Sequence, residues 1–242
     1  MKRNLVAGAL VLLAGSLVAA DSNPKEEVQA AAKKLADKGS YSWKTTVNMG
    51  GGGGGGGGGR FRPGPVEGKT EKEGATLLKM SGQDNTIEAV LKGTKGAVKA
   101  DAGWMSLSDA AEEQGPARFA AFMLRSFKTP AAQAGEVAGQ TKELKMADGA
   151  YSGDLTEEGA KQLLRFRGRQ GGGNGPEISG AKGSVKFWVK DGVLTKYEYN
   201  VQGTVSFNGN DREVNRTTTT EITDVDSTKV TVPEEAAKKL SD

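Results

Sequence analysis

Alternation of apolar and polar residues is strongest between positions 183 and 223, and it predicts three long antiparallel strands. Asp191-Gly192 and Asn208-Gly209 interrupt the alternation, and both pairs are typical of two-residue hairpin turns. One face of this predicted meander is polar and the other is apolar, so other elements must cover the apolar face. That face carries Val185, Phe187, Val189, Val193, Tyr197, Tyr199, Val201, Val205 and Phe207.

The same two patterns, period two and helical period, divide the rest of the chain. Period two predicts strands at 41–49, 75–81, 85–92, 95–100, 103–107, 142–147, 150–155 and 229–232. Helical spacing predicts helices at 24–38, 117–128 and 156–166, and a last helical turn from 233. Asn23 and Thr156 are predicted N-caps, and Pro130 is predicted to end the helix at 117–128.

Two glycine-rich stretches separate predicted elements. Ten consecutive glycines begin at Gly50, and a second glycine-rich run follows Gly168. Glycine loses the most backbone entropy on ordering and has no side chain to bury, so both are predicted to be flexible insertions, at 50–65 and 168–176. Their flanking arginines predict either solvated loops or a mobile cationic rim for an anionic lipid surface: Arg60, Arg62, Arg165, Arg167 and Arg169.

The N-terminal 20 residues have the layout of a secretory signal peptide. Lys2 and Arg3 precede an apolar run that ends at small residues, with cleavage expected after Ala20. Ser16 stands where a lipobox would have its lipidated cysteine, so no lipid anchor is expected. The sequence therefore predicts a periplasmic or secreted protein with a single domain at 21–242.

Composition excludes several kinds of chemistry. The chain contains no histidine and no cysteine, which removes thiol nucleophiles, imidazole bases and the usual zinc sites. Ser179 and Lys182 have the spacing of serine–lysine acyl enzymes, but a turn before a strand is the simpler interpretation. The acidic pairs Glu26-Glu27, Glu112-Glu113, Glu157-Glu158 and Glu234-Glu235 are all predicted to lie in first turns of helices, where the helix dipole favours negative charge. No enzyme activity, cofactor or metal is expected.

Charge is nearly balanced, with 33 Lys+Arg against 30 Asp+Glu. Lys2 and Arg3 leave with the predicted signal peptide, so the remaining chain is close to neutral. Because a nucleic-acid-binding domain needs a basic footprint, no nucleic-acid partner is expected.

In its order of elements the chain resembles the LolA/LolB-like lipoprotein-carrier superfamily, which includes mycobacterial glycolipid-carrier lipoproteins and envelope-stress sensor domains. The resemblance is carried by the signal peptide, the first helix, two meanders with a helical section between them, and the run from Val185 to Tyr197. It implies an α+β fold with a strongly curved antiparallel sheet, an unclosed half-barrel, covered by a few helices. It also implies a carrier without enzyme activity.

In this superfamily, acyl chains occupy an apolar cavity between sheet and helices. The predicted lining from the strands is Trp43, Val47, Leu78, Met80, Ile87, Leu91, Leu144, Met146, Val185, Phe187, Val189, Tyr197, Tyr199 and Val201, with Phe119, Phe122, Met123 and Phe127 as a lid. The alternative is that these residues close on one another as an ordinary core.

The implied partner is a lipid or an acylated polypeptide, bound by a monomer that makes transient contact with a membrane surface. An envelope interaction or sensor domain with a filled core, which would bind another envelope protein, is the alternative. The superfamily controls cargo release through a positioned arginine, whereas the first strand here offers only Lys44 and Thr46.

Overall fold

A computed structural model describes residues 23–50, 64–82, 86–100, 103–165, 176–207 and 209–241. The predicted signal peptide lies outside these residues, and so does most of each predicted glycine-rich insertion.

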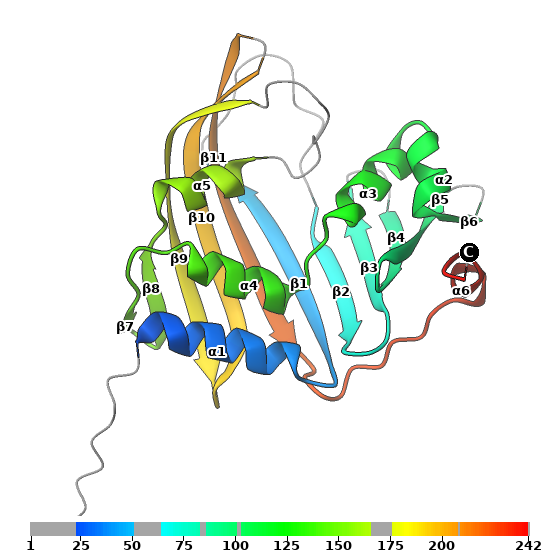
Figure 1. The fold of residues 1–242 in the computed structure, drawn as a ribbon, viewed down its shortest axis with the longest axis horizontal. Coiled ribbons are helices and arrows are strands. Elements are labelled where there is room, and N and C mark those ends of the chain that lie inside the picture. Colours follow the sequence, from blue (N-terminus) through cyan, green and yellow to red (C-terminus); the bar gives the residue numbers. More distant parts are fainter. Residues whose placement is uncertain are drawn as a thin grey trace, which may run out of the picture.

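One curved antiparallel sheet of eleven strands forms the body of the protein, in the order β6-β5-β4-β3-β2-β1-β11-β10-β9-β8-β7 (Figure 1). The strands are β1 (Ser40–Met49), β2 (Val66–Glu71), β3 (Thr76–Ser81), β4 (Thr86–Lys92), β5 (Lys95–Ala100), β6 (Gly103–Ser106), β7 (Lys145–Ala147), β8 (Ala150–Asp154), β9 (Glu177–Lys190), β10 (Val193–Phe207) and β11 (Asn210–Thr223). The outermost strands β6 and β7 do not pair with each other, so the sheet is not closed. The α+β fold with an unclosed, helix-covered antiparallel sheet is therefore confirmed.

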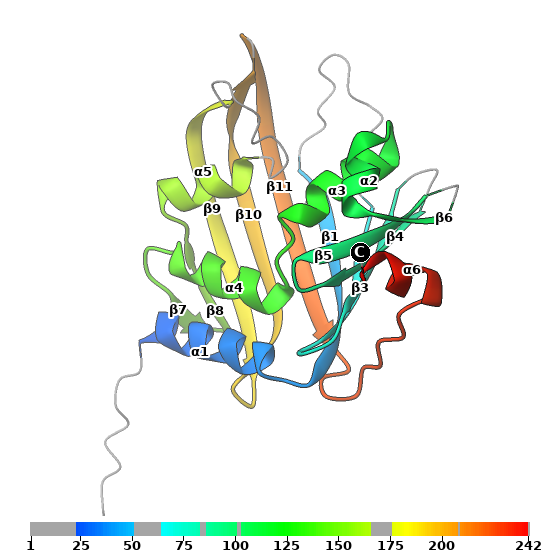
Figure 2. The same cartoon turned by 45° about the vertical axis from the view of Figure 1, so that its right-hand side comes forward.

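The helices form two groups (Figure 2). They are α1 (Pro24–Ala36), α2 (Leu107–Glu112), α3 (Pro116–Arg125), α4 (Pro130–Gly139), α5 (Glu157–Leu164) and α6 (Glu234–Lys239). Helices α1, α4 and α5 cover the half formed by β8–β11, whereas α2 and α3 cover β4–β6. Strand β1 lies between these halves, since it pairs with β2 on one side and with β11 on the other.

A second, smaller apolar cluster lies on the opposite face of β3–β5. Side chains alternate between the faces of a strand, so Val90 and Ala97 point away from the face that α3 covers. The C-terminal segment covers them with Ala236 of α6, together with Val230 and Val232. The prediction of a strand at 229–232 is wrong, because this segment pairs with no strand in the described part of the chain.

The helix caps and the hairpin turn predicted from local sequence signals are present in the structure. The Asn23 side chain accepts a hydrogen bond from the Lys25 N–H at 3.0 Å, and Thr156 accepts one from Gly159 at 3.0 Å. The turn between β9 and β10 has positive φ at both Asp191 (53°) and Gly192 (72°), as a type I′ hairpin requires. These local predictions are confirmed.

The sequence did not predict β2 or α4, and it placed the ends of some other elements differently from the structure. β2 escaped notice because a short, charged strand with a central glycine lacks apolar alternation. Pro130 begins α4 instead of only ending α3, and Thr129 caps it by accepting from the Ala132 N–H. The predicted helix at 117–128 is shorter, at Pro116–Arg125, and Glu112-Glu113 lies at the C-terminal end of α2 and not in a first turn.

Candidate functional site

A cavity of about 550 Å³ lies on the helix-covered face of the sheet, between β2–β5 and residues at the start of α2 and the end of α3. On the sheet side, its lining comes from the start of β1 and from the turns β2–β3 and β4–β5. On the helix side, it comes from the end of α1, the start of α2 and the end of α3. Segments far apart in the chain therefore meet at one hollow between sheet and helices.

The floor of the cavity is a row of paired strand residues. The pairing runs from Tyr41 to Thr70, from Thr70 to Thr76, from Thr76 to Leu91 and from Leu91 to Gly96. Directly paired residues point to the same face, so their side chains form one continuous surface. The Thr76 hydroxyl donates to the Thr70 hydroxyl at 3.3 Å, which satisfies two buried polar groups within the floor.

Trp43 forms a buried wall beside this floor. Its indole N–H donates to the Thr70 hydroxyl at 3.2 Å, and its ring stacks on Phe127 with centroids 5.9 Å apart. A Cβ added to the paired residue Gly68 would lie 2.2 Å from two atoms of the indole ring. Glycine at position 68 therefore lets the ring lie directly on the backbone of β2.

The roof is apolar and is made by Leu107, Leu124 and Phe127. Leu107 approaches the floor closely, because a Cβ at Gly96 would lie 2.6 Å from its Cδ1 atom. Half-buried Met80 and Ile87 lie opposite each other on β3 and β4, on the face that carries Leu78, and extend the apolar surface beyond the Trp43 wall. The cavity thus combines an apolar roof with a floor whose hydroxyls are already bonded.

Burial also disfavours ionisation of the Tyr41 hydroxyl in the floor. The pKa of Tyr41 is raised chiefly by desolvation, while hydrogen bonds with Thr129, the Ala131 backbone and Thr70 act in the opposite direction. The phenol stays protonated at neutral pH. In the part of the chain that the structure describes, no three His, Cys, Asp or Glu residues gather as metal ligands.

An ion pair lies at the edge of the cavity, where Lys38 lines it. The Lys38 ammonium lies 2.7 Å from the Asp226 carboxylate, which also accepts the Gly39 N–H at 2.9 Å. The hydrogen bond from Lys38, and after it that from Gly39, lowers the pKa of Asp226 below its usual value. Asp226 is solvent-accessible, so this contact is a local clamp and not a major source of stability.

Stability should respond to acid through this clamp. A carboxyl group whose pKa is depressed on folding stabilises the fold above its unfolded-state pKa of about 3.9, and this is lost as pH falls through the lower folded-state pKa. We expect the difference in urea midpoint between wild type and Asp226→Asn to be constant above about pH 5 and to shrink below it. Asp154→Asn, at an exposed position on β8, is the control, and identical pH profiles for both variants would contradict the role of Asp226.

The residues predicted to line a cavity fall into three groups. Eight are buried: Trp43, Leu78, Leu144, Val185, Phe187, Tyr197, Tyr199 and Val201. Six are half-buried: Val47, Met80, Ile87, Leu91, Phe127 and Val189. Four are exposed: Phe119, Phe122, Met123 and Met146, at 45%, 39%, 41% and 53%. Leu91 and Phe127 line the cavity under α3, while Leu144 and Met146 line a hollow of about 540 Å³ beside the start of α1.

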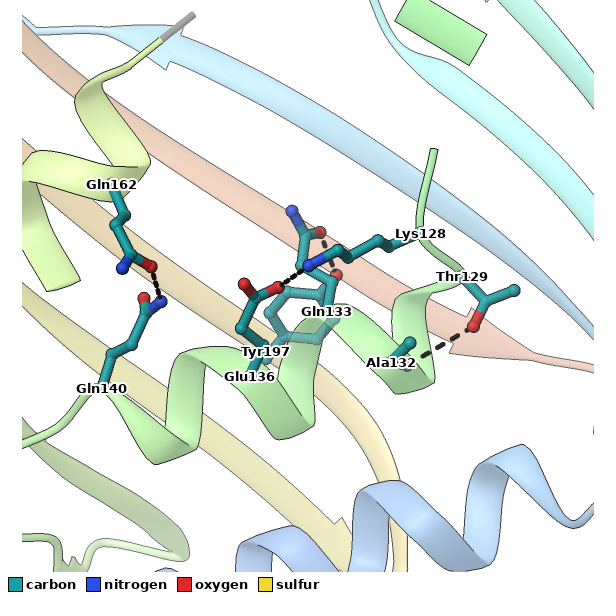
Figure 3. Close-up of polar contacts among 8 residues, drawn as sticks. All are labelled: Lys128, Thr129, Ala132, Gln133, Glu136, Gln140, Gln162 and Tyr197. Atoms are coloured by element: carbon teal, nitrogen blue, oxygen red, sulfur yellow. Dashed lines mark hydrogen bonds and ion pairs between the residues drawn. The ribbon is translucent and has the colours of Figure 1, made fainter. Parts of the chain in front are cut away.

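The half of the sheet under α1 and α4 is closely packed. Phe187 and Tyr197 stack with centroids 6.4 Å apart, and both are almost fully buried. The Tyr197 hydroxyl donates to the Gln133 side chain of α4 at 2.6 Å, and Gln140, the C-cap of α4, donates to the Gln162 side chain of α5 (Figure 3). In this half the described side chains contact one another and the helices that cover them.

Helix α3, which contains three of the four residues predicted to form a lid, has one buried face and one exposed face. Ala120, Ala121 and Leu124 are buried against the sheet side, and Leu124 belongs to the cavity roof. Phe119, Phe122 and Met123 project to the outside of the same helix. The helix covers the cavity, but with a face other than the aromatic stripe seen in the sequence.

Sequence reasoning missed one arginine that joins sheet and helix. Arg216 of β11 pairs with Val201 and Met49, and its Nη2 donates to the Leu163 carbonyl of α5 at 2.6 Å. A cation is favoured at the C-terminal end of a helix. The alternation along 210–223 already placed Arg216 on the face of Thr218, Thr220 and Ile222, so this signal was present in the sequence.

Ser179 and Lys182, which have the spacing of a serine–lysine pair, lie away from the cavity. Both are exposed near the start of β9, on either side of Gly180 (φ 61°) and Ala181, and neither lines the cavity. No helix in the described ranges has the length and hydropathy that crossing a bilayer requires.

Comparison with known proteins yields only distant structural similarity. No protein-family model matches the sequence, and no curated protein matches it significantly. The crystal structure of LprF from Mycobacterium bovis aligns over 88% of this chain and 97% of its own, with 13% identity and a TM-score of 0.46. That of the Mycobacterium tuberculosis lipoprotein LppX covers 88% and 100%, with 9% identity and a TM-score of 0.45.

Proposed function

We propose that this protein is a non-enzymatic binder or carrier of lipids or acylated polypeptides outside the cytoplasm, with an acyl chain held under α2 and α3. The observation that carries the proposal is the cavity of about 550 Å³ between sheet and helices, with its apolar roof. Small-molecule sites typically have volumes of about 300–1,000 Å³, and this cavity lies within that range.

The energetics of such binding are sufficient without a reaction or a metal. Each methylene buried from water contributes about 0.8 kcal/mol, so about ten of them supply roughly 8 kcal/mol. That free energy corresponds to about micromolar affinity before the entropy lost on association is subtracted. Leu107, Leu124 and Phe127 provide the contact surface, and Trp43 stacks on Phe127 from behind this lining.

The hydroxyls of the floor also favour a binder over a hydrolase. Thr70 and Thr76 are bonded to each other, and Thr70 further accepts the Trp43 N–H. Burial raises the pKa of Tyr41, which opposes formation of a phenolate nucleophile.

Trp43 provides a direct test, because it lies beside Phe127 of the roof. We expect brominated palmitate to quench tryptophan fluorescence saturably, since bromine on a bound chain comes close to the Trp43 ring. Trp43→Phe should remove most of this quenching, whereas Trp188→Phe, at a half-buried position on β9, should retain it. Native mass spectrometry of protein purified from its own host should in addition find a bound amphiphile.

An envelope interaction or sensor domain is the second candidate. It is favoured by the packed half under α1 and α4 and by the exposed Phe119, Phe122 and Met123 on α3. A domain of this kind predicts no saturable quenching and no bound amphiphile in the same experiments, and that result would overturn the carrier proposal.

A further inference from the structure

Exposed apolar side chains are concentrated on one helix. Five large apolar side chains are exposed in the part of the chain that the structure describes, and Phe119, Phe122 and Met123 of α3 are three of them. The other two, Met49 and Met146, lie on separate strands. Single apolar residues scattered over a surface are ordinary, whereas a cluster of them marks a contact surface. The outer face of α3 therefore has the character of a docking surface.

Helical spacing places two arginines beside these apolar side chains. Residues three and four apart are neighbours on a helix surface, so Arg118, Phe122 and Arg125 form one row of α3. Phe119 and Met123 form the adjacent row. Both arginines are exposed, α3 contains no acidic residue, and no described carboxylate forms an ion pair with either arginine. The outer face thus joins apolar side chains to two guanidinium groups that no ion pair neutralises.

The opposite face of the same helix closes the cavity. Leu124 contributes to the cavity roof, and Arg125 also lines the cavity, so this arginine lies where the outer row and the cavity meet. Helix α3 lies over the sheet at the end away from β7 (Figures 1 and 2). A surface on which α3 docks would therefore adjoin the cavity.

We propose that the outer face of α3 docks on a phospholipid bilayer, with Phe119, Phe122 and Met123 inserted among the acyl chains and Arg118 and Arg125 at the phosphates. Amphipathic helices bind membranes in this way. A guanidinium group offers a fork of donors that matches phosphate oxygens, and the exposed apolar side chains need only a fluid apolar phase. This inference rests on the proposed function for its purpose, since a lipid carrier must meet the membrane that supplies its ligand.

The neighbouring helix decides how this docking depends on charge. Helix α2 packs against α3 and exposes Asp109, Glu112 and Glu113 at its surface or its C-cap. These carboxylates offset Arg118 and Arg125, so the two helices together have no positive excess to attract an anionic membrane over a distance. Insertion of the apolar side chains supplies the affinity, and the arginines act only in contact with phosphate. Docking should therefore occur on zwitterionic lipid and depend weakly on salt.

Co-sedimentation with phosphatidylcholine vesicles tests the docking, using protein purified from its own host. We expect wild type to bind, with an affinity that changes by less than about threefold between low and high salt. Phe122→Ser combined with Met123→Ser should weaken binding about a hundredfold, because about tenfold is lost with each inserted side chain. Met49→Ser combined with Met146→Ser is the control, since it removes two exposed apolar side chains outside α3 and should leave binding unchanged. A urea midpoint establishes that each variant is folded.

Vesicles of digalactosyldiacylglycerol, a lipid without phosphate, test the role of the arginines. We expect wild type to bind them about tenfold more weakly than phosphatidylcholine vesicles. Arg118→Gln combined with Arg125→Gln should bind both kinds of vesicle equally, at the weaker level. Lys186→Gln combined with Lys190→Gln, at exposed positions on β9, changes the net charge by the same amount and should keep the preference for phosphatidylcholine.

The outcomes separate this inference from the proposed function. If wild type binds no vesicles while brominated palmitate still quenches Trp43, membrane docking is overturned and the carrier proposal stands. An envelope protein as the occupant of this face predicts that result. Unchanged binding by the folded Phe122 and Met123 double variant would also overturn the docking of α3. Vesicle binding without any quenching by brominated palmitate would support the docking surface and refute the carrier.

Discussion

Gly68→Val is expected to lower the free energy of unfolding by about 3–5 kcal/mol, the range for loss of a large buried side chain. A Cβ at this position would lie 2.2 Å from the Trp43 ring. The backbone of β2 cannot move away from the ring, because its pairing within the sheet holds it in place. The indole must therefore leave its site, and with it go the stack on Phe127 and the hydrogen bond to Thr70. Urea unfolding followed by circular dichroism measures the loss.

Gly135→Ala is the matched control for this substitution. A Cβ there would lie 3.9 Å from the Ala32 Cβ, an ordinary contact between α4 and α1. Because glycine within a helix is less favourable than alanine by about 0.5–1 kcal/mol, this variant should be more stable than wild type. A Gly68→Val protein within about 1 kcal/mol of wild type would show that Trp43 does not depend on the glycine.

Leu91→Trp is expected to abolish ligand uptake while the protein stays folded. Leu91 is a half-buried residue of the cavity floor, directly beside Thr76, and its side chain faces the cavity. An indole at this position occupies space that an acyl chain would need. Loss of contact with only four or five methylenes would weaken binding by about 3–4 kcal/mol, which is more than a hundredfold.

The quenching titration with brominated palmitate measures this effect, with a urea midpoint to establish that the variant is folded. Thr46→Trp is the matched control, because it adds the same side chain to an exposed position on the other face of β1. Unchanged binding by folded Leu91→Trp would place the ligand elsewhere, and the hollow beside α1 that contains Leu144 and Met146 would become the next candidate.

The arrangement of helices explains why the cavity lies where it does. Helices α1 and α4 pack closely together and cover the aromatic residues of β9 and β10, so that half has the character of a core. The short helices α2 and α3 cover the other half with alanine and leucine, whose smaller side chains fill less of the space above β4 and β5. The aromatic residues of α3 that could have filled it face outward instead.

Much of the fold was predictable because its signals are local. Hairpins at Asp148-Gly149 and Asp191-Gly192 depend on which residues tolerate positive φ, and the caps Asn23 and Thr156 depend on a side chain bonding a backbone group two or three residues away. Of the two missed elements, α4 carries such signals in Thr129 and Pro130, whereas β2 carries none. Strand β2 has almost no apolar residues, and it exists because β1 and β3 supply partners on both sides.

The candidate site was predictable only in part. The sequence by itself determined which residues face the covered side of the sheet, because alternation along a strand decides that locally. Only the tertiary structure decided which of them close into a core and which leave a cavity, because that depends on which helix lies above each strand. Trp43 lies on Gly68, and the cavity is lined by residues of α1, β2, β4 and α3, so both features join segments that are distant in the sequence. Such contacts follow from strand order and helix placement, which no local pattern encodes.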